Sequence, residues 1–228
     1  MDSVPPFTGF RPEGIQFLVD LADNNSREWF QPRKAEYERL LKEPLAQLCV
    51  ALEEQFRARG IPLQADPAKS PFRIYRDVRF SKDKSPYKTH AGALMTRSGG
   101  KNDPGVLYIH VSPEGCFAAA GFHMPEPETL RRMREAIKAK PARFKAVLAA
   151  LDKGGLKLGD DNQLTRIPRG FEAFKDGPLA EAFRLKSFIV EESVAEAVVC
   201  SSKLTDVMIG FADRALPLLK FGWTALEE

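Results

Sequence analysis

The sequence is poor in the residues that bind metals and form disulfides. Three cysteines and three histidines are spread over 228 residues, and no CxxC, HxH or HExxH spacing brings two of them together. The cysteines, Cys49, Cys116 and Cys200, are odd in number, and each lies among apolar neighbours. We therefore expect buried free thiols and no metal site.

Long apolar runs and nucleotide-binding motifs are also missing. No stretch approaches the roughly 18 apolar residues of a membrane span. The N-terminus, MDSVPPFTGF, has an acid where a signal peptide has basic residues. We therefore expect a cytoplasmic protein without membrane association. The patterns GxxxxGK[ST], GxGxxG and GxSxG are absent as well, so the sequence supports neither a known nucleotide loop nor a serine nucleophile, and any cofactor is unknown.

What the chain does contain is apolar content in helical spacing. Its composition is 43% hydrophobic with 16 phenylalanines, enough for a substantial core. The spacing predicts helices over 12–25, 26–30 and 32–59. Gly60 is expected to end the third helix, and Pro44 to kink it or to start a second helix there.

The apolar period then shortens to that of strands. We predict strands at about 72–80, 88–97, 105–112 and 116–123. The turn sequences SGGKNDPG and SPEG join the last three strands, which predicts an antiparallel meander. If SPEG closes the last hairpin, His110 faces Phe117.

Helical spacing returns after Pro125, and it continues to the end of the chain with one interruption. KSFIVEES is predicted to form a further strand, and a short helix is expected near 178–184. A terminal helix is predicted to begin after Ser201 or Ser202 and to be broken or kinked at Pro217.

These elements predict an α+β fold, with a central antiparallel sheet of about four to six strands flanked by N- and C-terminal helices. We expect a single domain over 1–228. Its parts are helices at about 8–60, the sheet at about 70–124, and a helical or mixed part at about 125–228.

The segment RIYRDVRFSKDKSPYKTH, residues 73–90, concentrates positive charge. Between Lys69 and His90 there are seven lysines and arginines against two aspartates, whereas the formal net charge of the whole chain is only +3. The rest of the chain is therefore slightly acidic, and the positive charge is a local feature.

Arg76 is the anomaly of the predicted strand 72–80, because alternation places it in an otherwise apolar row. A buried guanidinium without an acceptor would cost several kcal/mol. Two interpretations stay open: Arg76 pairs with an internal acid from a helix or is turned outward by a bulge, or it lines a concave site and meets an anionic ligand.

Cations, hydroxyls and free backbone N–H groups of this kind can hold a phosphate or a carboxylate. His90 is a candidate general acid or base, with Asp77 or Asp83 orienting it. Simple hydrogen bonding of His90 to a backbone carbonyl is the alternative. Arg166 and Arg169 in LTRIPRGFE could complete the site or lie on a surface loop. The candidate ligand-binding residues are Arg73, Tyr75, Arg76, Arg79, Lys84, Tyr87, Lys88 and Arg169.

Six stretches resemble the motifs of one protein family in the same order: LADNNSREWF, RIYRDVRFSKDKSPYKTH, LYIHVSPEG, GFHMP, LTRIPRGFE and LKSF. The family is one of conserved hypothetical bacterial and fungal proteins of unknown function. The resemblance implies one domain over nearly the whole chain, with helices around a central sheet. It implies no reaction, cofactor or catalytic residue.

Three functional hypotheses follow. The first is a pocket for a small anionic ligand, with or without enzymatic turnover. The second is a nucleic-acid-binding module, in which lysine and arginine neutralise phosphates while aromatic residues stack on bases. The third is a purely structural or protein-facing charge cluster. The ligand, the occurrence of chemistry and the oligomeric state are left open by the sequence.

Overall fold

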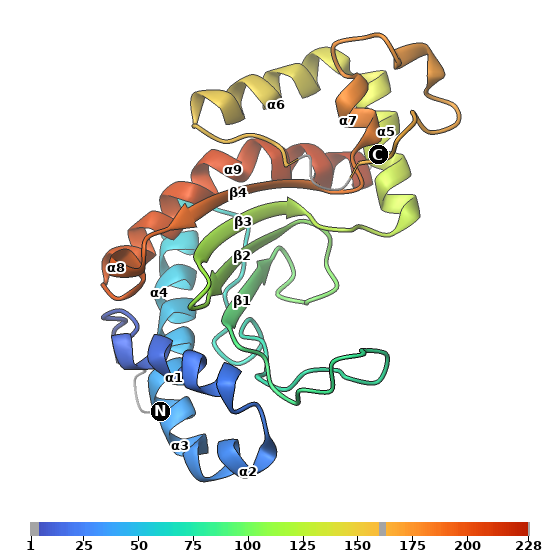
Figure 1. The fold of residues 1–228 in the computed structure, drawn as a ribbon. Helices are drawn as coiled ribbons and strands as arrows, with labels where there is room; N and C mark the ends of the chain where they lie inside the picture. The colour runs from blue at the N-terminus through green and yellow to red at the C-terminus, as the bar shows by residue number, and fades with distance from the viewer. Residues whose placement is uncertain (1–4, 160–162, 228) are drawn as a thin grey trace. The chain divides into compact units, whose positions relative to one another are not determined.

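The computed structural model describes residues 5–159 and 163–227. Its strands form a four-stranded antiparallel sheet in the order β1-β2-β3-β4, with helices before and after it in the chain (Figure 1). The strands are β1 (Ala91–Thr96), β2 (Val106–Val111), β3 (Cys116–Phe122) and β4 (Phe188–Val194). The predicted α+β class and the antiparallel meander are therefore confirmed.

The described chain groups into two compact units. The first contains the residues up to Lys101 together with Tyr108–Ala118 and Ser193–Gly210. The second contains Asn102–Leu107, Ala119–Glu192 and the chain from Phe211 onward. Folding of the chain as one domain stays a prediction.

Helices fill the N-terminal part of the first unit. They are α1 (Pro12–Asp23), α2 (Arg27–Phe30), the 3-10 turn η1 (Gln31–Arg33), α3 (Lys34–Tyr37), the π-helical turn η2 (Glu38–Lys42), α4 (Glu43–Arg59) and, later in the chain, α8 (Glu196–Val199). Ser26 caps α2 by accepting a hydrogen bond from the N–H of Trp29 at 3.2 Å. Gly60 ends α4 in the left-handed conformation, with φ of 65°, as its position predicts.

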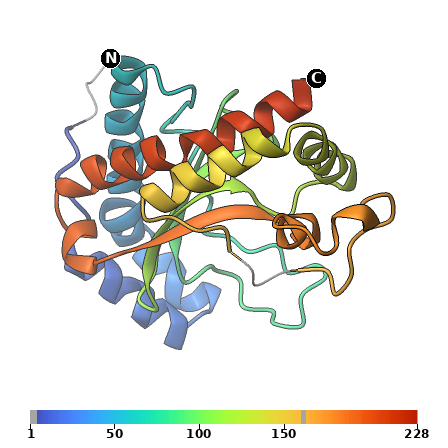
Figure 2. The ribbon, with the colours of Figure 1, turned by 90° about the horizontal axis from the view of Figure 1, so that it is seen from above.

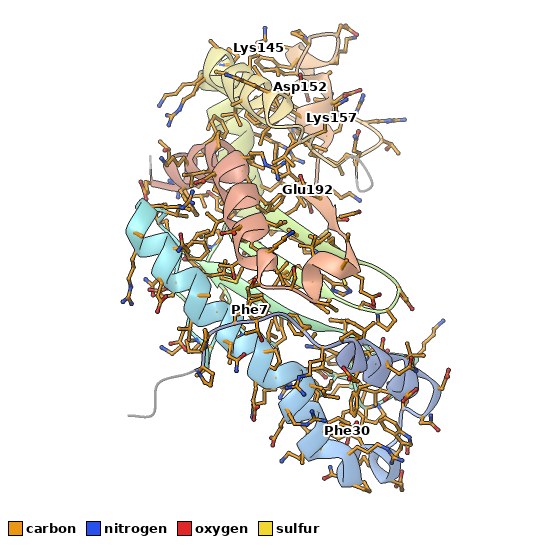
Figure 3. The ribbon with its side chains drawn as sticks, turned by 90° about the vertical axis from the view of Figure 1, so that its left-hand side faces the viewer. Phe7, Phe30, Lys145, Asp152, Lys157 and Glu192 are labelled. Atoms are coloured by element: carbon orange, nitrogen blue, oxygen red, sulfur yellow. The ribbon has the colours of Figure 1, made fainter. Side chains whose placement is uncertain are left out.

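An aromatic core holds the first helices together. Phe30 is 1% exposed and contacts Phe17 and Tyr37, with ring centroids 6.4 and 5.5 Å apart respectively. Figure 3 labels Phe30 where it lies among the side chains of these helices. Rigid rings packed in this way fix the turn from α1 to α3.

β2 presents two different faces. Leu107, Ile109 and Val111 are fully buried, whereas Tyr108 and His110 between them are half-buried. α4 lies against β1 within the first unit. Alternation along β2 therefore gives Tyr108 and His110 the opposite face from the apolar row, and this face adjoins the candidate site.

The second unit is built around a phenylalanine core. Its helices are α5 (Pro127–Ala139), α6 (Pro141–Lys153), the 3-10 turn η3 (Glu172–Phe174), α7 (Ala180–Arg184) and the C-terminal part of α9 (Lys203–Glu227). Phe144 of α6 lies 6.1 Å from Phe188 and 5.0 Å from Phe221 between ring centroids. α6 therefore runs beside the C-terminal part of α9 (Figure 2).

α9 continues through Pro217, so the predicted break at this residue is wrong, whereas a kink there stays a prediction. The neighbouring Leu218 and Leu219 are both fully buried, and this burial offsets the hydrogen bond that proline cannot donate. Cys49 and Cys116 are buried as expected, whereas Cys200 is half-buried; all three are free thiols. No helix of the described chain is both long and apolar enough to cross a membrane.

Candidate functional site

The basic segment 73–90 does not form the strand predicted at 72–80. It runs as an irregular loop before β1 (Figure 1), held by isolated bridges between Pro71 and Ala93 and between Tyr75 and Tyr87. The N–H of Arg76 still donates to the carbonyl of Pro86 at 2.9 Å. Beyond this bond, aspartate side chains accept from backbone N–H groups that a ladder would use. The strand predicted at 72–80 is therefore wrong. Exposure still alternates over 72–79 as expected, with Arg76 half-buried in the same row as the buried Ile74, and Phe80 departs from the pattern because it is 96% exposed.

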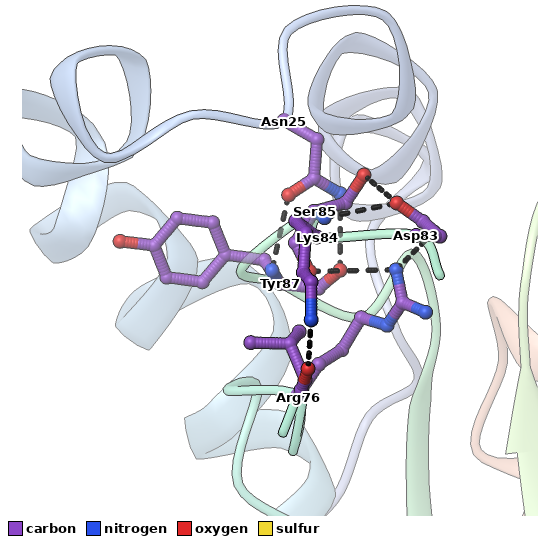
Figure 4. Close-up of polar contacts among 7 residues, drawn as sticks. Asn25, Arg76, Asp83, Lys84, Ser85 and Tyr87 are labelled. Carbon is purple, nitrogen blue, oxygen red and sulfur yellow. Dashed lines mark hydrogen bonds and ion pairs between the residues drawn. The ribbon is translucent and has the colours of Figure 1, made fainter. Parts of the chain in front are cut away.

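Two aspartates accept these backbone hydrogen bonds. Asp77 accepts from the backbone N–H of Arg79 at 3.2 Å and from its guanidinium at 3.0 and 2.6 Å. Asp83 accepts from the N–H and hydroxyl of Ser85 at 2.9 and 2.6 Å, and it also pairs with Arg76 (Figure 4). Arg76 thus has a carboxylate partner, but from its own loop and not from a helix.

These pairs lower the pKa of both aspartates. The hydrogen bonds from Arg79 lower the pKa of Asp77 to about 2. The hydrogen bonds from Ser85, followed by that from Arg76, hold the pKa of Asp83 below its ordinary value. Both carboxylates are therefore ionised at neutral pH, and each offsets one arginine of the segment.

Tyr87 anchors the base of the loop. The amide of Asn25 accepts from the N–H of Tyr87 at 3.0 Å and donates to its carbonyl at 3.0 Å (Figure 4). The ring is 1% exposed and stacks on Phe30 with centroids 4.1 Å apart. Tyr87 therefore ties the basic segment to the N-terminal helices.

Arg73, Lys88 and Lys101, named here the cationic cluster, lie close to Phe72. The Nζ atoms of Lys88 and Lys101 lie 4.9 and 4.4 Å from the ring centroid of Phe72, which is cation–π range. Lys88 donates to the carbonyl of Arg73 at 3.1 Å, and Lys101 donates to that of Pro71 at 2.7 Å. In residues 5–159 and 163–227, no carboxylate oxygen lies within 4.0 Å of any of these three cations.

The positive charges of the cationic cluster lie close enough to one another to change lysine pKa values. Burial lowers the pKa of Lys88, and the charges of Lys101 and Arg73 lower it further. Burial and the charge of Arg73 likewise lower the pKa of Lys101. Each shift means that the ammonium form is less favourable here than in water, because burial removes part of its hydration and neighbouring cations repel it.

His90 lies at the edge of the cluster, in a row of rings. Its ring centroid is 4.5 Å from that of His110, which stacks on Phe117 at 4.6 Å. The hydroxyl of Tyr108 lies 3.0 Å from Nδ1 of His110. The predicted facing of His110 and Phe117 is therefore confirmed.

Burial and the charge of Lys88 lower the pKa of His90. Burial, with His90 as a smaller cause, lowers the pKa of His110 to about 4. Both rings are thus neutral at pH 7. Within the described ranges no hydrogen bond joins His90 to Asp77 or Asp83, the aspartates expected to orient it.

The structure places the other predicted ligand-binding residues in different surroundings. Arg73 and Lys88 remain without carboxylate partners, whereas Arg76 and Arg79 are paired. Tyr75 is 42% exposed, and Lys84 donates to the carbonyl of Val78 at 3.0 Å. Arg166 and Arg169 belong to the second unit, and their part in the site stays a prediction.

Lys101 is the member of the cluster that sequence reasoning missed. It lies in the turn sequence SGGKNDPG between β1 and β2, 13 positions after Lys88. The one feature of the sequence that could have predicted its position is the expected hairpin. When β1 pairs with β2, the turn that carries Lys101 lies near the segment before β1. Among the described residues no group of three or more histidine, cysteine or acidic side chains is placed to hold a metal ion.

The fold and the site define an α+β protein whose first unit carries a compact group of unpaired cations. A family model described as "Conserved hypothetical protein (DUF2461)" matches residues 13–221, so the chain belongs to this family. The resemblance to an uncharacterised family is thereby confirmed. No curated protein and no solved structure matches the chain.

Proposed function

We propose that the protein binds a small phosphate- or carboxylate-bearing ligand at the cationic cluster. The observation that supports this proposal is the grouping of Arg73, Lys88 and Lys101 without a carboxylate within 4.0 Å among the described residues. Each lysine uses one N–H on a backbone carbonyl, which leaves two donors per ammonium. Together with the guanidinium fork, these donors match the oxygens of an anion.

Energetics favour a ligand over a purely structural role. Repulsion from Lys101 and Arg73 adds to burial in lowering the pKa of Lys88, and such repulsion destabilises the unliganded fold, whereas the exposed pairs elsewhere in the loop contribute little. A bound anion would reverse the repulsion and stabilise the charged forms of both lysines. The cation–π contacts and carbonyl bonds of the two lysines do not remove this repulsion, and a bound anion would.

Turnover is a secondary hypothesis within this proposal. His90 lies near Lys88 and has a lowered pKa, so its neutral ring could accept a proton from a ligand at the cluster. The arginines hold Asp77 and Asp83, so neither aspartate supports His90 as an orienting carboxylate. Binding is therefore the function that the geometry supports best.

The test is a titration of the protein with inorganic phosphate at low salt, in which the midpoint temperature of thermal unfolding is measured at each phosphate concentration. Phosphate at about 100 times its dissociation constant should stabilise the fold by about 2.7 kcal/mol. Lys88→Gln should abolish the shift, because it removes an unpaired cation. Lys82→Gln is the matched control, since Lys82 is an exposed lysine of the same segment and lies outside the cationic cluster. An equal shift in wild type and Lys88→Gln would contradict the proposal.

A further inference from the structure

A hollow of about 240 Å³ adjoins the cationic cluster in the first unit. It is lined by residues of α2, α3, the turn η2 and the start of the basic segment: Phe30, Lys34, Tyr37, Glu38, Lys42, Arg73, Ile74 and Tyr75. Sites that bury a whole drug-sized ligand measure about 300–1,000 Å³. The hollow can therefore admit one ring system and leave the rest of a ligand outside.

Its walls are aromatic, and they are supported from within. Phe30 contacts Tyr37 and Tyr75 with ring centroids 5.5 and 6.5 Å apart. Tyr87 packs beneath this wall, 4.1 Å from Phe30 and 5.4 Å from Tyr75. Rings fixed in this way offer faces on which a planar ligand can stack at small entropic cost.

The two phenols at the hollow are available to a ligand. Burial is the main cause that raises the pKa of Tyr37 to about 12, with the neighbouring Glu38 and Tyr75 adding to it. The phenol is therefore a neutral donor at physiological pH. Neither hydroxyl has a hydrogen-bond partner in the part of the chain that the structure describes.

The charge of the hollow is positive. Its one carboxylate, Glu38, pairs with Lys42 at 3.5 Å. Lys34 and Arg73 have no carboxylate oxygen within 4.0 Å among the residues that the structure describes. Arg73 also acts on Lys88 and Lys101, so the hollow and the cationic cluster share this arginine.

A local change of helix type shapes this side of the hollow. The π-helical turn Glu38–Lys42 precedes Pro44, whose ring nitrogen cannot donate to the carbonyl four residues earlier. The helix changes its hydrogen-bond register there and widens. Such π-turns cost stability relative to a regular α-helix and are common at functional sites.

We infer that the hollow takes the planar ring of the ligand whose anionic group lies at the cationic cluster, so that the ligand class is a nucleoside phosphate. This inference rests on the proposed anion site. Tyr37 and Tyr75 hold the ring, Arg73 bridges the ring and the phosphate, and Lys88 and Lys101 hold the phosphate oxygens.

The experiment compares three probes by isothermal titration calorimetry at low salt: inorganic phosphate, adenosine 5′-monophosphate and adenosine. The nucleotide should bind about tenfold more tightly than phosphate, as expected for one stacked base. Tyr75→Ala should remove that advantage and leave phosphate binding within twofold, because Tyr75 is 42% exposed and its loss perturbs the fold little. Lys88→Gln should weaken both phosphate and nucleotide.

Phe80→Ala provides the matched control, because Phe80 is an aromatic residue of the same segment, 96% exposed and outside the hollow. It should leave all three affinities unchanged. Equal affinities for phosphate and nucleotide would overturn this inference and leave the anion site standing. A nucleotide advantage lost in Phe80→Ala but kept in Tyr75→Ala would overturn it too. Absence of phosphate and nucleotide binding would overturn the anion site and this inference together.

Discussion

At the scale of single residues, Tyr87 combines tight packing with an unsatisfied polar group. Its ring is 1% exposed, and among the described residues its buried hydroxyl has no hydrogen-bond partner. Leaving a buried hydroxyl without a partner costs about 1–3 kcal/mol. The contribution of Tyr87 to the fold therefore comes from its ring and from its backbone bonds to Asn25.

Two substitutions separate the ring from the hydroxyl. Tyr87→Phe should leave the free energy of unfolding unchanged or raise it, because it removes only the unsatisfied group. Tyr87→Ala should lower it by about 3–5 kcal/mol through loss of the stacked ring. Urea unfolding measures both values. Strong destabilisation by Tyr87→Phe would show that the hydroxyl has a partner or a role that this account omits.

His110 makes stability depend on pH. Its folded-state pKa is about 4, below the ordinary value of 6.5, mainly because the ring is buried. As the pH falls from about 6.5 to about 4, the unfolded state takes up a proton that the folded state resists. In this window the unfolded state binds more protons than the folded state. The free energy of unfolding therefore decreases as the pH is lowered from about 6.5 to about 4.

His110→Gln should therefore flatten the fall in urea midpoint between pH 7 and pH 4.5, because glutamine does not titrate. His123→Gln is the control, since His123 is an exposed histidine of the same chain. The slope of His123→Gln should match that of wild type. Equal slopes for wild type and His110→Gln would contradict the assignment.

At the scale of elements, the pairing of β3 with β4 depends on a glycine. Gly121 lies in β3 with φ of 132°, a conformation that side-chain-bearing residues rarely adopt. A Cβ atom there would overlap the carbonyl oxygen of Phe188 and lie 3.1 Å from Cα of Ile189. Glycine is thus required by both backbone conformation and close approach.

Gly121→Ala should lower the free energy of unfolding by about 2–5 kcal/mol, from backbone strain and overpacking together. Gly210→Ala supplies the contrast, because Gly210 lies within α9 and a Cβ there meets nothing within 4 Å. It should raise stability by about 0.5–1 kcal/mol. Chemical unfolding of the two variants measures both values. A change below about 0.5 kcal/mol for Gly121→Ala would contradict the account of β3 and β4.

At the scale of the whole molecule, apolar periodicity predicts most helices and strands, because the burial of apolar side chains determines both that periodicity and the secondary structure. The meander at 88–123 and the strand in KSFIVEES follow from alternation and turn residues, which act locally. The segment 72–80 alternates just as well but forms no strand. There Asp77 and Asp83 accept from the backbone N–H groups of Arg79 and Ser85, a competition that alternation alone does not show.

The sequence predicts where the candidate site lies but not which residues belong to it. The sequence locates the cations at 73–90, yet it cannot show that Arg76 and Arg79 are paired while Arg73 and Lys88 are not. Short loop geometry decides those pairs. Lys101 reaches the cationic cluster because β1 pairs with β2. This pairing is a long-range contact that no local motif reveals.

The most direct test of the central claim is calorimetric titration of the whole protein with inorganic phosphate at low salt, using wild type, Lys88→Gln and Lys82→Gln. The expected result is saturable one-site binding that Lys88→Gln abolishes and Lys82→Gln retains. Phosphate binding unaffected by Lys88→Gln, or no phosphate binding, would contradict this claim, and steeply salt-dependent binding of short RNA would then favour a nucleic-acid interface.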